Sequence, residues 1–275
     1  MAMKFRCNRK GGGAIVEMPK MAGRLHALWC CLAFLVLIVL PGHPVAAQTR
    51  GIDVSKFQGK INWTKVAKDK TIKFVYVKAT EGTSIRDPYY KTNIAKARKA
   101  GLLVGSYHLY SSKTTAYQQM ANFKSMVNKK EQDLVPVLDI EGHHSGRLYM
   151  ERVDKLLELM EKEYGVKPMI YTSEKVYKLH FSGKKYRKYH IFIANYRRTP
   201  SVRYTLWQFT ETGHVSGISG CVDISKFDRN HGLSDILLPK KKKKGSDKDT
   251  SSTPVESVAA PADTAAAKVD STSTK

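Results

Sequence analysis

Cysteine is scarce in this 275-residue chain, and most of it lies close to the start. Cys7, Cys30 and Cys31 fall within the first 31 residues, and Cys221 is the fourth cysteine. Four cysteines in a chain of this length exclude a fold built on disulfides. If the first 47 residues are removed, Cys221 alone remains and no disulfide can form within the rest of the chain. We interpret Cys221 as a small buried apolar residue without a further role.

Long hydrophobic runs are also missing, with one exception. Residues 27–40 are uncharged and apolar, but a membrane-spanning helix needs about 20 such residues. A polytopic membrane protein is therefore excluded. Lys20 and Arg24 precede the run and Val45-Ala-Ala follows it, which is typical of a secretory signal peptide cut before Gln48. We expect a secreted or periplasmic, envelope-located protein, which contacts a membrane only if this segment stays uncleaved.

Acidic residues are few relative to basic ones. The chain has 24 Asp and Glu against 47 Lys and Arg, a formal charge of +23. Residues 48–239 retain 33 basic and 18 acidic side chains, an excess of +15. Such an excess favours an anionic partner, for which nucleic acid, teichoic-type polymer, anionic lipid and peptidoglycan all qualify. The Lys-, Arg- and Tyr-rich segment 186–198 lacks a DNA- or RNA-binding signature, so we do not expect a nucleic-acid partner.

Composition divides the chain into three segments. Residues 1–47 form an N-terminal extension with the signal peptide, and residues 48–239 form the globular domain. Residues 240–275 begin with five lysines, and no aromatic residue occurs after them. Such a segment cannot bury enough apolar area to fold, so we expect a disordered tail. The tail either is simply solvated or adheres to an anionic envelope polymer or membrane face.

The globular domain alternates short β-rich runs with helical patterns. Several of the runs are continuously apolar, as in parallel strands buried on both faces. Amphipathic patterns over 87–100, 114–128 and 148–164 predict helices between the earlier strands. The eight predicted strands are 51–54, 74–79, 102–108, 135–140, 169–172, 191–194, 205–209 and 221–224.

These elements predict an α/β fold in a single domain. A domain of about 190 residues is short for eight strands in a full (β/α)8 barrel, which typically has about 250 residues. Toward the end of the domain the helical patterns shrink and strands follow one another closely. We therefore expect an incomplete TIM-like β/α barrel whose last helices are reduced or missing.

Polar side chains gather at the ends of the predicted strands, where barrels of this kind hold their catalytic groups. Several acids that converge on one rim repel one another and raise each other's pKa. Such a costly arrangement indicates that the acids have a function. The strand-end residues are Asp53, Lys78, Glu81, His108, Asp139, Glu141, Tyr171, Asn195, Tyr196, Gln208 and Asp223.

Asp139 and Glu141 form the sharpest local feature, in the segment Val-Pro-Val-Leu-Asp-Ile-Glu. On an extended chain their side chains share a face, about 6.6 Å apart along the strand. Paired carboxyls can hold different protonation states at one pH, and glycosidic cleavage uses such a pair. Alternatively, the two are surface acids or metal ligands.

The neighbouring motifs carry a family resemblance. They are Gly-Ile-Asp-Val-Ser-Lys-Phe-Gln-Gly (51–59), Val-Lys-Ala-Thr-Glu-Gly (77–82), Gly-Ser-Tyr-His-Leu-Tyr (105–110), Trp-Gln-Phe (207–209) and Cys-Val-Asp-Ile-Ser (221–225). Together they resemble glycoside hydrolase family 25, the Chalaropsis-type lysozymes, over roughly residues 50–238. The resemblance implies an incomplete β/α barrel that hydrolyses the β-1,4 bond between N-acetylmuramic acid and N-acetylglucosamine in peptidoglycan. It implies no cofactor, and we expect a monomer.

The resemblance also assigns roles to individual residues. Glu141 matches the general acid, and Asp139 matches the acid that orients the substrate acetamido group or assists the water. Asp53 and Asp223 match the remaining two acids of the cleft. The substrate-binding candidates are Tyr107, Tyr171 and Trp207, as aromatics of the sugar cleft, together with Glu81 and Asn195.

Other readings remain open for several residues. Glu81 and Lys78 are expected to form a structural ion pair near the rim, and His108 to be hydrogen-bonded beside the site rather than a base. His143 and His144 follow Glu141, but no third ligand has a suitable spacing, so no metal site is expected. The alternative function is a non-catalytic peptidoglycan-binding module that keeps the sugar cleft.

Overall fold

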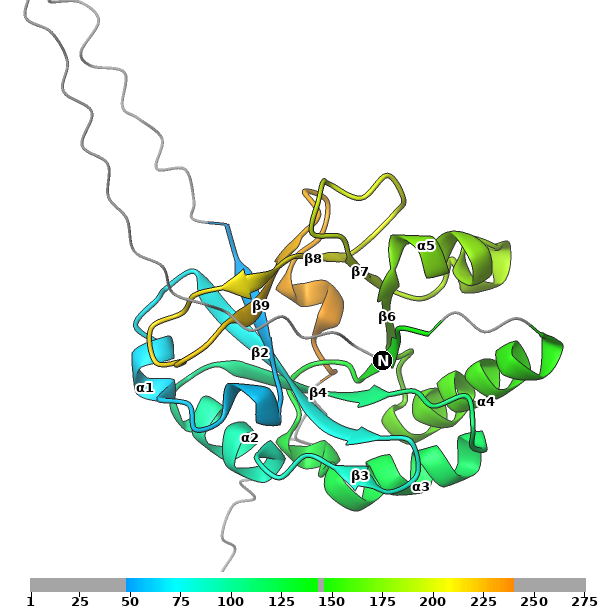
Figure 1. The fold of residues 1–275 in the computed structure, drawn as a ribbon, viewed down its shortest axis with the longest axis horizontal. Helices are drawn as coiled ribbons and strands as arrows, with labels where there is room; N and C mark the ends of the chain where they lie inside the picture. Colours follow the sequence, from blue (N-terminus) through cyan, green and yellow to red (C-terminus); the bar gives the residue numbers. More distant parts are fainter. Residues whose placement is uncertain (1–47, 143–145, 240–275) are drawn as a thin grey trace, which may run out of the picture. The chain divides into compact units, whose positions relative to one another are not determined.

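Eight strands close into a barrel in the computed structural model, which describes residues 48–142 and 146–239 (Figure 1). Strand β1 hydrogen-bonds to both β2 and β9, and these two pairings close the ring. The predicted signal peptide and lysine-rich tail lie outside the described residues. The barrel strands are β1 (Arg50–Val54), β2 (Ile72–Glu81), β4 (Leu103–Leu109), β5 (Val137–Ile140), β6 (Met169–Ser173), β7 (Ile191–Ala194), β8 (Leu206–Gly213) and β9 (Val222–Phe227). The two-residue strand β3 (Ile85–Arg86) pairs only with β2.

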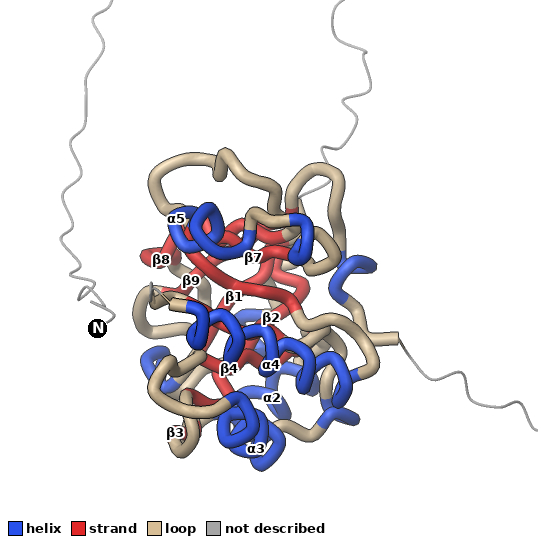
Figure 2. Tube along the Cα trace, turned by 90° about the vertical axis from the view of Figure 1, so that its right-hand side faces the viewer, coloured by secondary structure: helices blue, strands red, loops and turns tan. Residues whose placement is uncertain are grey.

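Helices flank the barrel (Figure 2); they lengthen from α1 to α4, and only short helical segments follow β6. They are α1 (Trp63–Val66), α2 (Tyr90–Lys99), α3 (Ala116–Met126), α4 (Arg147–Tyr164) and α5 (Glu174–Val176). Helix α2 packs on β2 and β4, and α3 packs on β2 and α4. A π-helical turn (Tyr177–Phe181) and a 3-10 turn (Lys184–Tyr186) follow α5, and no helix connects β7 to β8. The predicted incomplete barrel with reduced last helices is thus confirmed.

Strand β9 is the one barrel strand that runs against its neighbours. It pairs antiparallel with β8 and β1, whereas the other barrel pairings are parallel. The sequence pattern alone did not predict this direction. Only residues 214–221 connect β8 to β9, and a parallel crossover needs a dozen residues or more. Asp223 therefore lies at the start of its strand, not at its carboxyl end as predicted, and this start reaches the rim where β1 ends.

Large side chains from alternate strand positions fill the barrel. Phe74, Tyr76 and Phe192 are each about 1% exposed, and the Tyr76 ring lies against the rings of both Phe74 and Phe192. Two glycines leave room for them: a Cβ on Gly51 would lie 2.1 Å from the Phe74 ring, and a Cβ on Gly105 would lie 2.3 Å from Tyr76. The barrel interior is therefore packed around these rings.

A second apolar layer lies between the barrel and the helices. It includes Trp63, 3% exposed, whose indole N–H donates to Asn93 Oδ1 at 3.3 Å. Helix α4 ends at Gly165, which adopts a left-handed φ of 74° and donates to the Glu161 carbonyl. A glycine is the favoured residue at this position because it has no Cβ. The predicted helix end is confirmed.

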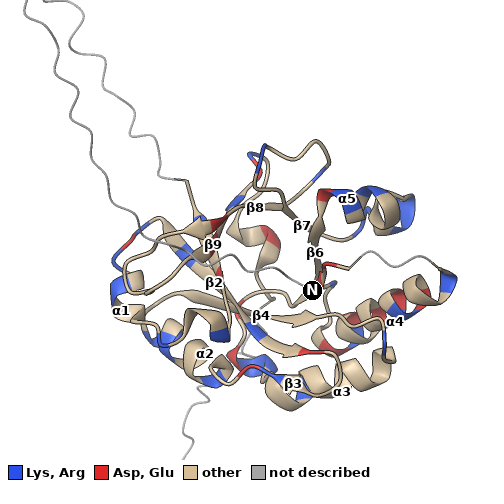
Figure 3. Ribbon diagram, viewed as in Figure 1, with Lys and Arg blue, Asp and Glu red and all other residues tan. Residues whose placement is uncertain are grey.

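Basic side chains are spread over α1, α2 and the region of α5 (Figure 3). Within the described ranges, no helix is long and apolar enough to cross a membrane.

Candidate active site

Four carboxyl groups line one cavity at the rim of the barrel. Asp53 comes from β1, Asp139 from β5, Glu141 from just beyond β5, and Asp223 from β9. The cavity encloses about 640 Å³, part of it open to solvent. Its other lining residues are Ser55, Phe57, Tyr76, Lys78, Tyr107, Leu109, Val137, Tyr171, Phe192 and Gln208.

Asp53 lies deep in this cavity, opposite Asp223 in the β1–β9 register. Its side chain is 8% exposed, and Gln208 Nε2 and Ser225 Oγ each donate to Oδ2 at 3.1 Å. Burial, and then the nearby charge of Asp223, raise the pKa of Asp53 to about 8, while the two hydrogen bonds oppose the shift. Asp53 is therefore protonated at neutral pH in the free protein.

Asp139 is 6% exposed, and its Oδ1 has no hydrogen-bond partner among the described residues. Burial, followed by the charge of Glu141, raises the pKa of Asp139 well above its usual range, and Lys78 opposes this shift. Glu141 lies two residues further along and is solvent-exposed. The pair thus combines a desolvated carboxyl at the floor with an accessible one at the mouth.

Aromatic side chains form part of the cavity wall. Tyr107 and Tyr171 both line it, and burial raises their pKa well above the usual range, so both remain neutral. Tyr171 Oη donates to Gln208 Oε1 at 2.8 Å, and Tyr196 Oη donates to the same atom at 2.7 Å. Phe57 lines the cavity while 59% exposed, a placement suited to contact with a sugar face.

Trp207 is not among the cavity residues, contrary to its predicted place in the sugar cleft. Side chains alternate along β8, so Gln208 faces the barrel interior and Trp207 faces outward. The indole N–H donates to the Asn195 carbonyl at 2.7 Å, and Lys226 Nζ lies 4.7 Å from the ring centroid. Gln208, to which the sequence assigned no particular role, takes the inward position. The alternation of side chains along β8 could have predicted this position.

The remaining sequence candidates lie beside the cavity. Glu81 contacts Lys78 Nζ at 2.7 Å as expected, but of the two only Lys78 lines the cavity. Asn195 lines an adjoining groove and donates to Glu174 Oε2 at 2.8 Å. His108 is buried, lies within 2.7 Å of Thr80 Oγ1, and its pKa is lowered to about 4 chiefly by burial. It is hydrogen-bonded beside the site, as predicted.

Potential metal ligands do not gather in the described part of the chain: it holds no group of three or more His, Cys, Asp and Glu side chains that could bind an ion. His143 and His144 lie outside that part.

The site has paired side-chain carboxyl groups at the rim where the parallel strands end, and tyrosines form part of the cavity wall. This arrangement defines a site of the glycosidase class. Comparison with known proteins narrows the class. The family model described as glycosyl hydrolases family 25 matches residues 52–218, and the chain belongs to this family. It is a glycoside hydrolase of the lysozyme type.

Two sequence relatives and two solved structures illustrate the similarity. YegX of Escherichia coli (strain K12) is 35% identical over 195 residues, covering 67% of this chain and 71% of that protein. Lysozyme M1 of Streptomyces globisporus is 32% identical over 200 residues, covering 65% and 67%. A family 25 glycosyl hydrolase from Bacillus anthracis superposes with a TM-score of 0.61 at 29% identity, covering 70% of this chain and 96% of that one. A lysozyme from Streptomyces coelicolor gives 0.60 at 28% identity, with the same coverage.

Proposed function

We propose that this protein is a muramidase, which hydrolyses the β-1,4 bond between N-acetylmuramic acid and N-acetylglucosamine in peptidoglycan. The observation that carries the proposal is the meeting of Asp53, Asp139, Glu141 and Asp223 around one cavity. Its relatives named as lysozymes support the choice of substrate.

Glu141 is the proposed general acid. Burial, followed by the charge of Glu141, raises the pKa of Asp139 well above its usual range, which favours retention of a proton by the pair. Glu141 is the exposed member, so its carboxyl is the one that a bound glycosidic oxygen can reach. Proton transfer to that oxygen lets the C1–O bond break as positive charge develops on the sugar ring. Water then adds at C1 and returns a proton to the pair.

Asp139 has the geometry to assist at the sugar itself. Its Oδ1 has no protein hydrogen-bond partner within the described residues, which leaves this atom for the substrate acetamido group or the attacking water. Asp53 and Asp223 face each other across β1 and β9. The protonated Asp53 positions the ring, and Asp223 stabilises the positive charge that develops on it. Tyr107 and Tyr171 pack beside the sugar.

Replacing Glu141 by Gln tests the assignment, because the amide keeps the shape and cannot donate an acidic proton. We expect muropeptide release from purified peptidoglycan to fall by at least about a hundredfold, with an unchanged unfolding curve. Glu158→Gln is the matched control, since Glu158 lies on the surface of α4 and contacts Lys155. Digestion of walls by E141Q at the wild-type rate would remove Glu141 from the mechanism.

The reducing-end sugar of the products tests the bond. Mass spectrometry should find N-acetylmuramic acid at the new reducing end, whereas N-acetylglucosamine there would indicate a glucosaminidase. Binding to peptidoglycan without new reducing ends would instead indicate the non-catalytic binding module.

Export is the last part of the proposal. The charged start, the apolar run 27–40 and the small residues Val45-Ala-Ala support cleavage before Gln48. N-terminal sequencing of the protein recovered from the envelope or the medium should begin at Gln48; a protein recovered only from the cytoplasm would refute it.

A further inference from the structure

The catalytic cavity continues into a second, wider groove. Glu141 and Tyr171 line both, so the two spaces meet at the general acid proposed above. The groove encloses about 1260 Å³, including space open to solvent, and runs between α5 and the loop after β7. Lys175 and Arg197 are the cations of its wall, and both are exposed.

Among the described residues, these two side-chain cations differ from their neighbours in having no protein partner. Lys178 and Arg198 contact the carboxylate of Glu174 at 2.7 and 3.3 Å. The Lys175 ammonium and the Arg197 guanidinium form no ion pair or hydrogen bond within the described residues. Their positive charge is therefore available to an anionic ligand in the groove, and Glu211, an exposed acid of the same wall, opposes it.

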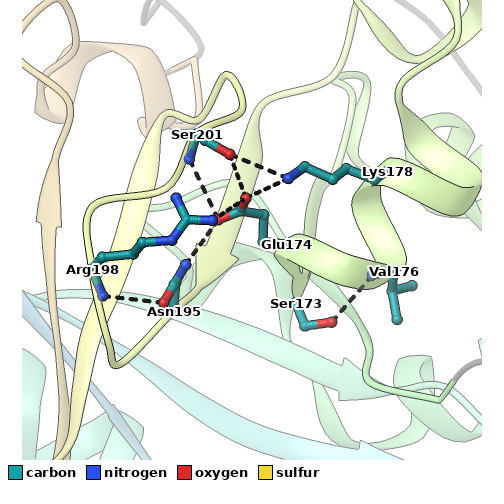
Figure 4. Close-up of polar contacts among 7 residues, drawn as sticks. All are labelled: Ser173, Glu174, Val176, Lys178, Asn195, Arg198 and Ser201. Carbon is teal, nitrogen blue, oxygen red and sulfur yellow. Dashed lines mark hydrogen bonds and ion pairs between the residues drawn. The ribbon is translucent and has the colours of Figure 1, made fainter.

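Figure 4 shows Glu174 in contact with Asn195, Arg198 and Ser201 of the loop after β7. Arg197 belongs to the same loop. The Glu174 carboxylate is buried and accepts from Asn195 Nδ2 at 2.8 Å and from Ser201 Oγ at 2.6 Å, besides its two cations. The hydrogen bond from Lys178, followed by that from Ser201, lowers the pKa of Glu174 to about 2, so the anchor stays ionised. A loop held in this way loses little further backbone entropy when its exposed side chain binds a ligand.

The chemistry of a muramidase indicates what enters this groove. The sugar whose anomeric carbon is attacked is the muramic acid, and its lactyl group carries the stem peptide. The peptide therefore starts inside the catalytic cavity and must leave through a space continuous with it. Stem peptides carry free carboxylates, which are the partners that ammonium and guanidinium groups bind.

We propose that the groove holds the stem peptide and that Lys175 and Arg197 bind its carboxylates, so that the enzyme prefers substrate with charged stems. This inference rests on the proposed function. A second basic groove, lined by Lys60, Lys68, Lys70, Lys96 and Lys99 beside α1 and α2, shares no lining residue with the catalytic cavity. It does not offer the peptide a path, and it supplies the control.

The test compares two soluble glycan oligomers, one with free stem carboxylates and one with the same carboxylates amidated. For the wild-type full chain we expect kcat/KM to be about tenfold higher on the free form, as two exposed charge pairs can supply. In K175E/R197E, and more weakly in K175Q/R197Q, this ratio should fall to about one. K68E/K99E changes the net charge equally at the other groove and should keep the wild-type ratio.

The possible results distinguish a failure of stem-peptide recognition from a failure of the proposed muramidase activity. A wild-type ratio near one, or a ratio that survives in K175E/R197E, overturns stem recognition while leaving the muramidase intact. Equal loss of the ratio in K68E/K99E also overturns it, because long-range charge would then explain the preference. If neither oligomer is hydrolysed, the proposed function fails. Calorimetric binding of the two oligomers then decides stem recognition, with tighter binding of the free form upholding it and equal binding overturning it.

Discussion

Replacing Asp53 by Asn should stabilise the protein at neutral pH, although Asp53 belongs to the proposed active site. In the folded chain the pKa of Asp53 is raised from 3.8 to about 8. Between these two values the folded state holds a proton that the unfolded state has released. The free energy of unfolding therefore decreases by about 1.4 kcal/mol for each pH unit in that range. Asn has no proton to take up and so escapes this loss.

The size of this decrease in the free energy of unfolding follows from the same pH interval. From pH 3.8 to pH 7 the loss amounts to about 4 kcal/mol, which sets the largest gain expected for D53N at neutral pH. The replacement also fits the site, because Asn Oδ1 can accept the hydrogen bonds that Gln208 and Ser225 now donate to the carboxyl. The two proteins should be equally stable near pH 4 and differ most at pH 8.

Urea unfolding at 25 °C from pH 4 to pH 9 measures the difference. Asp69→Asn is the control of opposite sign, since hydrogen bonds from Thr71 lower the pKa of the exposed Asp69. That substitution should cost stability above pH 4. A difference between D53N and wild type that stays constant across the pH range would refute the burial argument for Asp53. We also expect D53N to lose turnover, since stabilising substitutions in active sites commonly do so.

Three further predictions concern residues around the barrel. His108, with a pKa lowered to about 4, should make the protein lose up to about 3 kcal/mol of stability as pH falls from 6.5 to 4; denaturation of H108Q at pH 4 and pH 7 should show a smaller loss, and an equal one would contradict the assignment. Trp207→Phe removes the N–H bond to Asn195 and should cost about 1 kcal/mol in thermal unfolding; KM for glycan should not change, and a severalfold rise would return Trp207 to the sugar cleft. Gly105→Ala would place a Cβ 2.3 Å from Tyr76 and should destabilise by about 3 kcal/mol in urea; a wild-type midpoint would show that the interior is not packed as described.

The barrel could be predicted because its signals are local. Strands buried on both faces appear as apolar runs, and all eight predicted runs are strands, seven of them with shifted ends. Helices α2 and α4 are followed by glycines with positive φ, Gly101 and Gly165. Strand direction is not local, since it depends on which neighbours a strand pairs with. The antiparallel course of β9 could have been inferred only from the short connection before it.

The acids of the site were predictable, whereas the residues supporting them were only partly so. Asp139 and Glu141 share a face of one strand, which the spacing of two residues already dictates. The family motif around residues 207–209 drew attention to its largest aromatic, but position along β8 decides which side chain faces inward. Glu174 shows a further limit, because its partners Asn195 and Ser201 are more than 20 residues away and meet it only after β6 and β7 pair.

The closed barrel explains how carboxyls far apart in the sequence are held together despite their repulsion. Asp53 and Asp139 lie on strands with hydrogen-bonded neighbours on both sides, so neither can move away without breaking a ladder. The repulsion is instead relieved by protonation, as the raised pKa values of both groups indicate. Glu141 follows β5 at the exposed mouth of the cavity. A rigid, partly protonated floor beneath an accessible carboxyl is therefore a consequence of where the strands end, and it is the arrangement that acid-catalysed cleavage of a sugar polymer requires.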